Sequence, residues 1–294
     1  MSVLVLGRSG QLARALMQLA NAHGVQLEAI GRPDVDLENA DAVAALIGAR
    51  KPRVVVNAAA YTMVDKAEQE QDRAHAVNAL GPGAAAAAAA QVGARFIHVS
   101  TDYVFAGDKP APYVETDPTG PLGAYGATKL EGERLVLAAH PEAAILRTAW
   151  VFDAAGKNFV GAMLRLARQR EEVSVVVDEL GCPTLAEDLA DAILKLSERD
   201  ASGIYHCAGA GETTRAAFAE EIFAQSQARG GPSARVAHIT SAQYAANNPG
   251  LAKRPANSRL DCTKLATAHD VRPRDWRVAL GACLDDMAAG GWRI

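Results

Sequence analysis

Short apolar runs alternate with longer helical patterns through the first half of the chain. The runs are rich in valine, leucine and isoleucine, which favour buried strands. They predict strands at Val3–Leu6, Leu27–Ile30, Arg53–Val56, Arg95–Ser100 and Ala144–Arg147. Helical patterns separate them, at Leu12–His23, Ala40–Ala49 and the alanine-rich Ala84–Ala90. This alternation indicates right-handed crossovers and a parallel sheet that is covered by helices on both faces.

The pattern changes after Trp150, where the apolar runs become shorter and glycine, proline and asparagine interrupt them. Helices are predicted at Phe159–Arg170, Ala186–Ser197 and Arg215–Ala228, and Asn247–Asn257 is predicted to be a loop or lid. We therefore predict two domains with some chain crossing between them. Residues 1–150 form the domain with the large sheet, and residues 151–294 form a smaller C-terminal α/β lobe.

A glycine-rich turn follows the first predicted strand and leads directly into a helix. It reads Gly7-Arg8-Ser9-Gly10-Gln11-Leu12-Ala13, with the spacing G-x-x-G-x-x-A. Glycine at this turn lets the backbone approach a dinucleotide pyrophosphate, and the helix N-terminus offers free N–H groups to the anion. The fold class is therefore predicted to be α/β, a Rossmann-like doubly wound sheet. The predicted cofactor-binding residues of this turn are Gly7, Ser9, Gly10, Gln11 and Leu12.

Residues after the second and third strands complete the predicted cofactor site. After the second strand, Arg32 could neutralise a ribose 2′-phosphate, whereas Asp36 could accept hydrogen bonds from a free 2′-hydroxyl. Arg32 lies nearer the strand, which favours NADPH and leaves NADH as the alternative. After the third strand, small side chains would let a cofactor lie against the backbone. The cofactor-binding residues predicted in these two segments are Arg32, Asp36, Leu37, Ala58, Ala59, Ala60 and Tyr61.

Tyr125 and Lys129 are spaced to share one face of a helix. The fourth strand ends at Ser100-Thr101, which places the Thr101 hydroxyl at the carboxyl edge of the sheet. A hydroxyl, a phenol and a lysine beside a nicotinamide form a carbonyl-reduction site. We expect Lys129 to favour the ionised phenol and so to lower the pKa of Tyr125, and Thr101 to donate to the substrate carbonyl. Tyr125 and Lys129 are also predicted to contact the cofactor.

Composition and the remaining polar residues narrow the function further. A net charge of −4 argues against nucleic-acid binding, and no apolar run approaches the ~20 residues that span a bilayer. The four cysteines are scattered without a Cys-x-x-Cys pair, and the histidines form no His-x-x-His, so we predict a cytoplasmic protein without a metal. The acidic residues Asp65, Glu68, Glu70 and Asp72 are expected to form a solvated face near a helix start.

Together these motifs resemble the dTDP-4-dehydrorhamnose reductases, which are extended short-chain dehydrogenases, over essentially the whole chain. The resemblance rests on the glycine turn, on Asn57–Thr62 with Val64–Glu68, on Ser100–Phe105, and on Tyr125-Gly126-x-Thr128-Lys129; it continues in Arg147–Val151, Gly181–Thr184 and Arg254–Ser258. It implies NAD(P)H-dependent reduction of the C4 keto group of dTDP-4-dehydro-L-rhamnose, with Tyr125 as the proton donor. It also implies that Thr101, Asp102, Tyr103 and Trp150 contact the sugar and that Arg254 contacts the nucleotide diphosphate.

Some members of that family form a magnesium-bridged dimer through acidic residues, one of them early in the first helix. The first helix here, Gln11–Ala22, contains no acid, so we predict a monomer or a weak homodimer. Two alternative functions remain open from the sequence. One is a sugar-nucleotide epimerase or dehydratase, which shares the Tyr-x-x-x-Lys pair but recycles its cofactor. The other is a non-catalytic regulatory subunit that resembles the partner of methionine adenosyltransferase.

Overall fold

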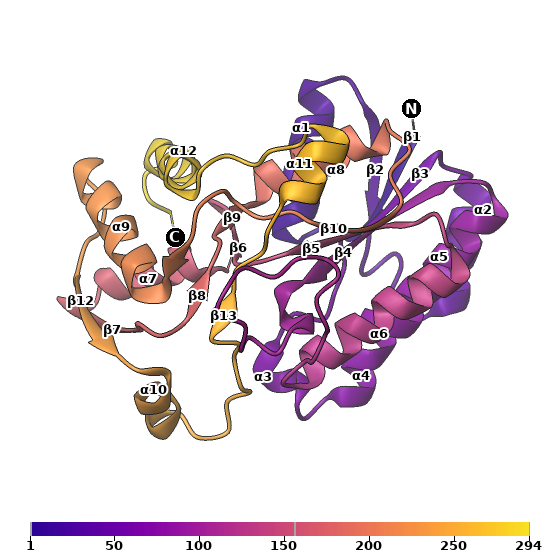
Figure 1. Cartoon of the computed structure of the whole chain (residues 1–294). Coiled ribbons are helices and arrows are strands. Elements are labelled where there is room, and N and C mark those ends of the chain that lie inside the picture. Colours follow the sequence, from indigo (N-terminus) through magenta and orange to yellow (C-terminus); the bar gives the residue numbers. More distant parts are fainter. Residues whose placement is uncertain (1, 156, 294) are drawn as a thin grey trace.

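The largest element of the computed structural model is a six-stranded sheet in which every neighbouring pair is parallel (Figure 1). The strand order is β10-β5-β4-β3-β1-β2. The strands are β1 (Ser2–Leu6), β2 (Gln26–Ile30), β3 (Val54–Asn57), β4 (Arg95–Thr101), β5 (Ala144–Thr148) and β10 (Gly203–His206). The structure describes residues 2–155 and 157–293, so the outer ends of the two predicted domains, Met1 and Ile294, lie outside the described residues.

Helices cover both faces of this sheet because successive strand residues point in opposite directions. In β1, Val3 and Val5 join one apolar core while Leu4 and Leu6 join another. The first core is closed by α1 (Gln11–Ala22), α8 (Ala186–Ser197) and α11 (Thr263–His269). The second is closed by α2 (Ala40–Arg50), α5 (Gly81–Gln91) and α6 (Ala124–Ala139). The predicted doubly wound α/β sheet is therefore confirmed.

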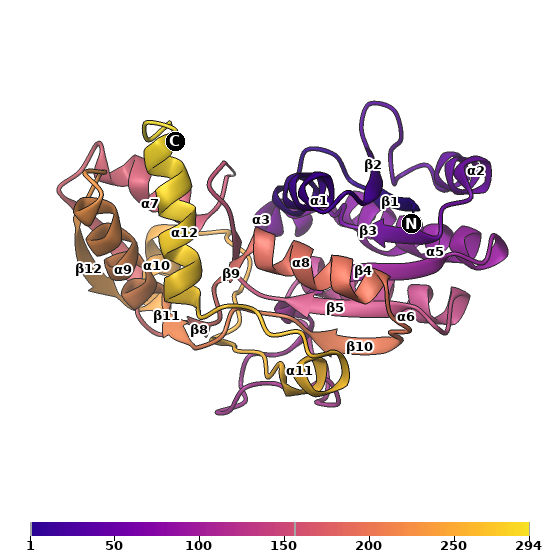
Figure 2. The same ribbon diagram turned by 90° about the horizontal axis from the view of Figure 1, so that it is seen from above.

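The sixth strand of the sheet, β10, was not predicted. It comes from the second half of the chain and pairs with β5, beyond the predicted domain boundary (Figure 2). Between β3 and β4 the chain forms further helical segments before α5. These are α3 (Val64–Ala67), α4 (Gln71–His75) and a π-helical turn, η1 (Ala76–Leu80). After β4, a 3₁₀ turn, η2 (Asp102–Val104), leads into the loop before α6.

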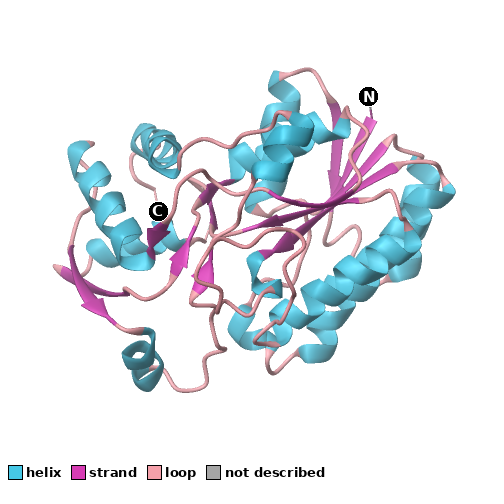
Figure 3. Ribbon diagram, viewed as in Figure 1, coloured by secondary structure: helices cyan, strands magenta, loops and turns pink. Residues whose placement is uncertain are grey.

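A second, smaller lobe surrounds its own apolar core, which includes Phe218 and Trp276. Three helices and a two-stranded parallel sheet enclose this core (Figure 3). They are α7 (Phe159–Ala167), α9 (Arg215–Ala228), α12 (Trp276–Ala289), β7 (Glu172–Val176) and β12 (Arg235–Ile239). The remaining elements are β6 (Val151–Phe152), β8 (Leu180–Gly181), β9 (Thr184–Leu185), β11 (Thr213–Thr214), α10 (Ser241–Asn247) and β13 (Asn257–Ser258). Among residues 2–155 and 157–293, no helix combines the length and apolar character that a membrane-spanning segment requires.

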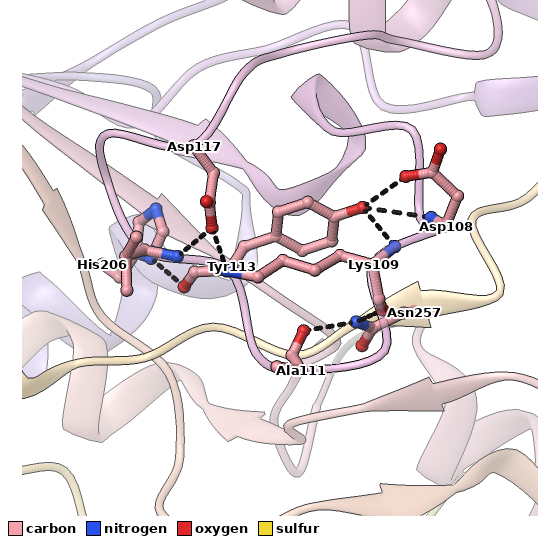
Figure 4. A network of polar contacts seen from close by, with 8 residues as sticks. Asp108, Lys109, Ala111, Tyr113, Asp117, His206 and Asn257 are labelled. Atoms are coloured by element: carbon pink, nitrogen blue, oxygen red, sulfur yellow. Dashed lines mark hydrogen bonds and ion pairs between the residues drawn. The ribbon is translucent and has the colours of Figure 1, made fainter.

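The loop that follows β4 is fastened to the second lobe by a polar network around Tyr113 (Figure 4). Asn257 of β13 donates its side-chain amide to the carbonyl oxygens of Lys109 and Ala111, at 2.7 and 2.9 Å. The Tyr113 hydroxyl accepts the backbone N–H of Lys109 at 3.2 Å, and the Tyr113 carbonyl lies 3.0 Å from His206 Nδ1 of β10. These contacts hold β13 beside the sheet edge where the predicted site lies.

Candidate active site

A cleft of about 970 Å³ lies at the carboxyl ends of β1, β3, β4 and β5. This is the edge at which open parallel sheets bind their ligands. The predicted catalytic and sugar-contacting residues Thr101, Asp102, Tyr103 and Trp150 line it. All of the predicted cofactor residues line it as well, namely Gly7, Ser9, Gly10, Gln11, Leu12, Arg32, Asp36, Leu37, Ala58, Ala59, Ala60, Tyr61, Tyr125 and Lys129. The structure therefore brings the predicted residues together, with the exception of Arg254.

The glycine turn at the start of α1 fits a dinucleotide pyrophosphate. Gly7 has φ +120°, and a Cβ atom there would lie 3.2 Å from Ala59 N, so glycine is required. Gly10 is the N-cap of α1 and offers no side chain to the first helical N–H groups. A Cβ at Gly10 would meet no atom within 4 Å, which leaves open space above the helix terminus. Open space and N–H groups without a side-chain cap suit an anion.

The turn after β2 carries the groups that would discriminate between the two nicotinamide cofactors. Arg8 forms an exposed ion pair with Asp34, with Nη1 and Oδ2 2.9 Å apart. Arg32 is exposed and lines the cleft beside it. Asp36 uses Oδ1 to accept the backbone N–H of Glu38 at 3.1 Å. Two arginines at this end of the cleft favour a phosphate over a free hydroxyl.

Helix α6 places Tyr125 and Lys129 one turn apart, and both line the cleft. The pKa of Tyr125 is raised, first by burial and then by the nearby carboxylate of Asp102. The expectation that Lys129 lowers the pKa of Tyr125 is therefore wrong for this structure. The reason is that the Lys129 ammonium group turns to β4, where Nζ donates to the carbonyl oxygen of Val99 at 2.7 Å. Tyr125 consequently holds its proton at neutral pH.

Lys129 also contacts a fully buried histidine that sequence reasoning missed. Asn57 Oδ1 accepts the N–H of Ala59 at 3.2 Å, which directs Asn57 Nδ2 to His98 Nδ1 at 3.0 Å. The neutral imidazole then carries its proton on Nε2, which lies 3.2 Å from Lys129 Nζ. Burial lowers the pKa of Lys129 to about 8, and the Glu133 carboxylate opposes this shift. Burial and the charge of Lys129 hold the pKa of His98 well below its usual value.

Thr101 and Asp102 lie at the end of β4 and face the same cleft. Thr101 Oγ1 donates to Asp102 Oδ1 at 3.0 Å and accepts the N–H of Tyr103 at 3.2 Å. Asp102 Oδ2 is buried and meets no partner at good hydrogen-bond geometry among the residues that the structure describes. Burial raises the pKa of Asp102 to about 6, and the nearby Ser258 hydroxyl, which lowers the pKa of this carboxyl, opposes the shift. A buried acceptor with no partner suits a ligand hydroxyl.

Trp150 forms a wall of the cleft in an unusual backbone conformation, with φ +48°. Its indole lies against Gly181, where a Cβ atom would come within 2.3 Å of the ring atom Cε2. The guanidinium carbon of Arg215 lies 3.5 Å from the centre of the indole ring. Arg215, the first residue of α9, is a cleft residue that sequence reasoning missed, because nothing in its local pattern distinguishes it from other helix-start arginines.

Arg254 does not line the cleft. Its Nη1 and Nη2 donate to the two carboxylate oxygens of Asp65 at 2.8 and 2.9 Å, and Asp65 also accepts the N–H of Ala252 at 3.0 Å. These hydrogen bonds fasten the loop around Arg254 to α3. The contact of Arg254 with a diphosphate stays a prediction.

Of the four acidic residues expected to form a solvated face near α3, Asp72 is exposed in the first turn of α4, whereas the other three are paired. Asp65 binds Arg254, and Glu70 accepts the Tyr61 hydroxyl at 2.9 Å. Glu68 Oε1 accepts the N–H of Ala124 at 2.8 Å, so it supplies the cap that the N-cap residue of α6 lacks. These carboxylates therefore support the loop after β3, which contains Tyr61, and the helix that carries Tyr125.

Comparisons with known proteins agree with this geometry. Residues 1–289 match the family model described as RmlD substrate binding domain. A dTDP-4-dehydrorhamnose reductase of Sinorhizobium fredii is 45% identical over 283 residues, which cover 94% of this chain and 94% of the relative. The crystal structure of a dTDP-4-dehydrorhamnose reductase from Clostridium acetobutylicum has a TM-score of 0.92 and 37% identity, covering 98% of this chain and 99% of that one. The reductase of Bacillus anthracis in complex with NADP has a TM-score of 0.91 and 32% identity, covering 97% and 99%. The chain belongs to the family described as RmlD substrate binding domain.

Proposed function

We propose that this protein reduces the C4 keto group of dTDP-4-dehydro-L-rhamnose to give dTDP-L-rhamnose, a precursor of cell-surface polysaccharides. One observation carries the proposal. A protonated phenol, a lysine and a threonine hydroxyl meet at the carboxyl edge of β4, in the same cleft as the glycine turn. The named relatives, which match over nearly their whole length, are reductases of this substrate.

The residues of the cleft fit a nicotinamide cofactor. The Gly7–Leu12 turn would hold the pyrophosphate, Arg8 and Arg32 a 2′-phosphate, and Lys129 the nicotinamide ribose. NADPH is therefore the proposed cofactor, with NADH as the alternative, and when bound it supplies the hydride for the carbonyl carbon.

The protein's own part in the reaction is proton donation and polarisation of the carbonyl. Tyr125 donates its phenolic proton to the C4 oxygen, which suits a phenol whose pKa is raised in the free protein. Thr101 donates a hydrogen bond to the same oxygen as negative charge develops there. Asp102, Tyr103 and Trp150 contact the sugar, and Asp102 Oδ2 accepts one of its hydroxyls.

The proposed setting is the cytoplasm, and the proposed assembly is a monomer or weak homodimer. All four cysteines are free thiols, which is typical of proteins in a reducing compartment. The first turn of α1 carries no acidic residue to share a magnesium ion with a second copy. Sedimentation at several protein concentrations, with magnesium and with a chelator, tests the assembly.

The activity is tested by incubating the purified protein with dTDP-4-dehydro-L-rhamnose and each reduced cofactor. We expect absorbance at 340 nm to fall in step with formation of dTDP-L-rhamnose. Tyr125→Phe should keep its affinity for the cofactor and lose most turnover, whereas Lys129→Ala should lose both. Permanently bound NAD with no net consumption would instead indicate an epimerase or dehydratase. A stable protein partner with no oxidation of either cofactor would indicate a regulatory subunit.

A further inference from the structure

Arg215 is held in the cleft by contacts from three directions. Its backbone N–H donates to the carbonyl oxygen of Glu179 at 3.2 Å, which fixes the start of α9. Its guanidinium carbon lies 3.5 Å from the centre of the Trp150 ring and 5.2 Å from that of Phe159. The indole of Trp150 packs directly on Gly181 and fills the position that a Cβ atom of residue 181 would take, so the ring cannot move further in that direction. The guanidinium is therefore built into the wall of the cleft.

The charge of Arg215 is only partly compensated. Its side chain is 19% exposed, and Glu179 is its ion-pair partner, with Nε and Oε2 3.6 Å apart. That separation is too long for a good hydrogen bond. Among the hydrogen bonds within residues 2–155 and 157–293, none is donated by the two terminal nitrogens of Arg215. A half-buried guanidinium with unused donors is stabilised when a ligand accepts hydrogen bonds from them.

The other cations of the cleft are committed elsewhere or lie in the open. Arg14 and Arg73 each bind a carboxylate, Arg8 lies with Asp34 at the cofactor end of the cleft, and Lys129 contacts His98 and Val99. Arg32 lies at the turn after β2, which fits the cofactor phosphate, and Lys157 is exposed. Arg254, outside the cleft, has both terminal nitrogens on Asp65. Among the described residues that line the substrate end of the cleft, Arg215 is thus the half-buried cation that still has donors to offer.

We propose that Arg215, backed by the Trp150 ring, binds the diphosphate of the sugar nucleotide. This inference rests on the proposed function for the identity of the nucleotide. A diphosphate is an anion and would supply a counter-charge to the guanidinium. Its oxygens also match the planar fork of N–H donors in arginine. Neutral sugar hydroxyls would accept hydrogen bonds but would add no negative charge to that of the Glu179 and Asp102 carboxylates, which already act on Arg215. The same Trp150 that contacts the sugar thereby orients the group that binds the adjoining phosphates.

The test is the affinity for dTDP compared with thymidine, measured by calorimetry on the full-length protein with NADP⁺ present. The wild type should bind dTDP more tightly than thymidine, and Arg215→Gln should weaken dTDP binding by about 10- to 100-fold with thymidine unchanged. Arg215→Lys keeps the charge and should lose less. Arg277→Gln is the matched control, because Arg277 also lies over an indole, 4.3 Å from the centre of Trp276, but away from the cleft.

Three results would overturn the assignment. The first is an Arg215→Gln protein that binds dTDP as tightly as the wild type. The second is a rise in KM for the sugar nucleotide with unchanged dTDP affinity, which would show that Arg215 contacts the sugar. The third is an equal loss in the Arg277→Gln control. The affinity for NADP⁺ serves as the check that each variant is folded. Because dTDP binding is measured without turnover, failure of the proposed reduction would be seen separately, in the wild-type assay at 340 nm.

Discussion

Replacement of Glu133 by glutamine should destabilise the protein strongly, because it breaks a buried ion pair between α6 and the central sheet. Glu133 lies one turn after Lys129 in α6 and accepts two hydrogen bonds from Arg147 of β5, at 2.9 and 2.7 Å. It also accepts the Ser100 hydroxyl at 2.5 Å. Both charged side chains are nearly inaccessible, at 3% exposure for Arg147 and 2% for Glu133.

The size of the effect follows from what the substitution leaves behind. The amide keeps the shape of the carboxylate but removes its charge, so the Arg147 guanidinium stays buried without a counter-charge. Arg147 Nη1 already lacks a hydrogen-bond partner among the described residues, so no neighbouring acceptor can replace the interactions that the substitution removes. Loss of one partner of a buried pair costs about 3–5 kcal/mol, which is a large part of a typical folding free energy of about 5–15 kcal/mol.

Urea unfolding followed by tryptophan fluorescence measures this loss directly. The control is Glu131→Gln, which removes an exposed pair with Arg134 at 3.4 Å and should cost about 1 kcal/mol or less. Glu133 also raises the pKa of Lys129, so Glu133→Gln should lower that pKa further and shift the pH profile of turnover in the surviving folded protein. If Glu133→Gln lowered the free energy of unfolding by less than about 1 kcal/mol, the reasoning would be refuted, because a buried Arg147 without its counter-charge should cost more than that.

Three further predictions concern the cleft and its support. Asp102 keeps its proton up to about pH 6 in the folded protein, against 3.8 ordinarily, so its contribution to the unfolding free energy falls as pH rises across that window. Asp102→Asn should remove this slope, and urea unfolding at pH 4 and pH 7 would detect it; an unchanged difference would contradict the raised pKa. Gly181→Ala should push the Trp150 indole into the cleft and raise the KM of the sugar nucleotide with little change for NADPH, as steady-state kinetics would show. Asn78→Ala removes hydrogen bonds of 2.8 and 3.2 Å to the Tyr61 backbone and should weaken NADPH binding, measured by fluorescence titration.

Much of the fold and of the cofactor end of the site could be predicted from the sequence, because each depends on local pattern. The Gly7–Leu12 turn, Thr101 at the end of β4 and the Tyr125–Lys129 spacing each follow from neighbours in the chain. The parallel strands then bring these three features to the same edge of the sheet, independently of the conformations of the connecting loops. Strand β10 was missed because its four residues show no alternation that sets them apart from a loop.

The remaining features depend on contacts between distant segments. Arg254 meets Asp65 across 189 positions, so neither residue's surroundings reveal the pair. The raised pKa of Tyr125 depends on the direction that Lys129 takes, and His98, 31 positions earlier, sets that direction. Arg215 depends on the packing of α9 against Trp150. These features could be seen only in the three-dimensional structure, because they depend on how deeply each side chain is buried and on which distant residues it contacts.

The origin of β10 in the second half of the chain has a consequence for how the protein can be cut or recombined. Its strand completes the sheet beside β5, and α8, which precedes it, covers α1 and one face of β1. A fragment that ended at residue 150 would leave β5 as a bare edge and an apolar face open to water. The cofactor half and the sugar half should therefore unfold together as one cooperative unit. Exchange of substrate preference between relatives would accordingly require grafting of side chains such as Arg215, since the second half is not a detachable module.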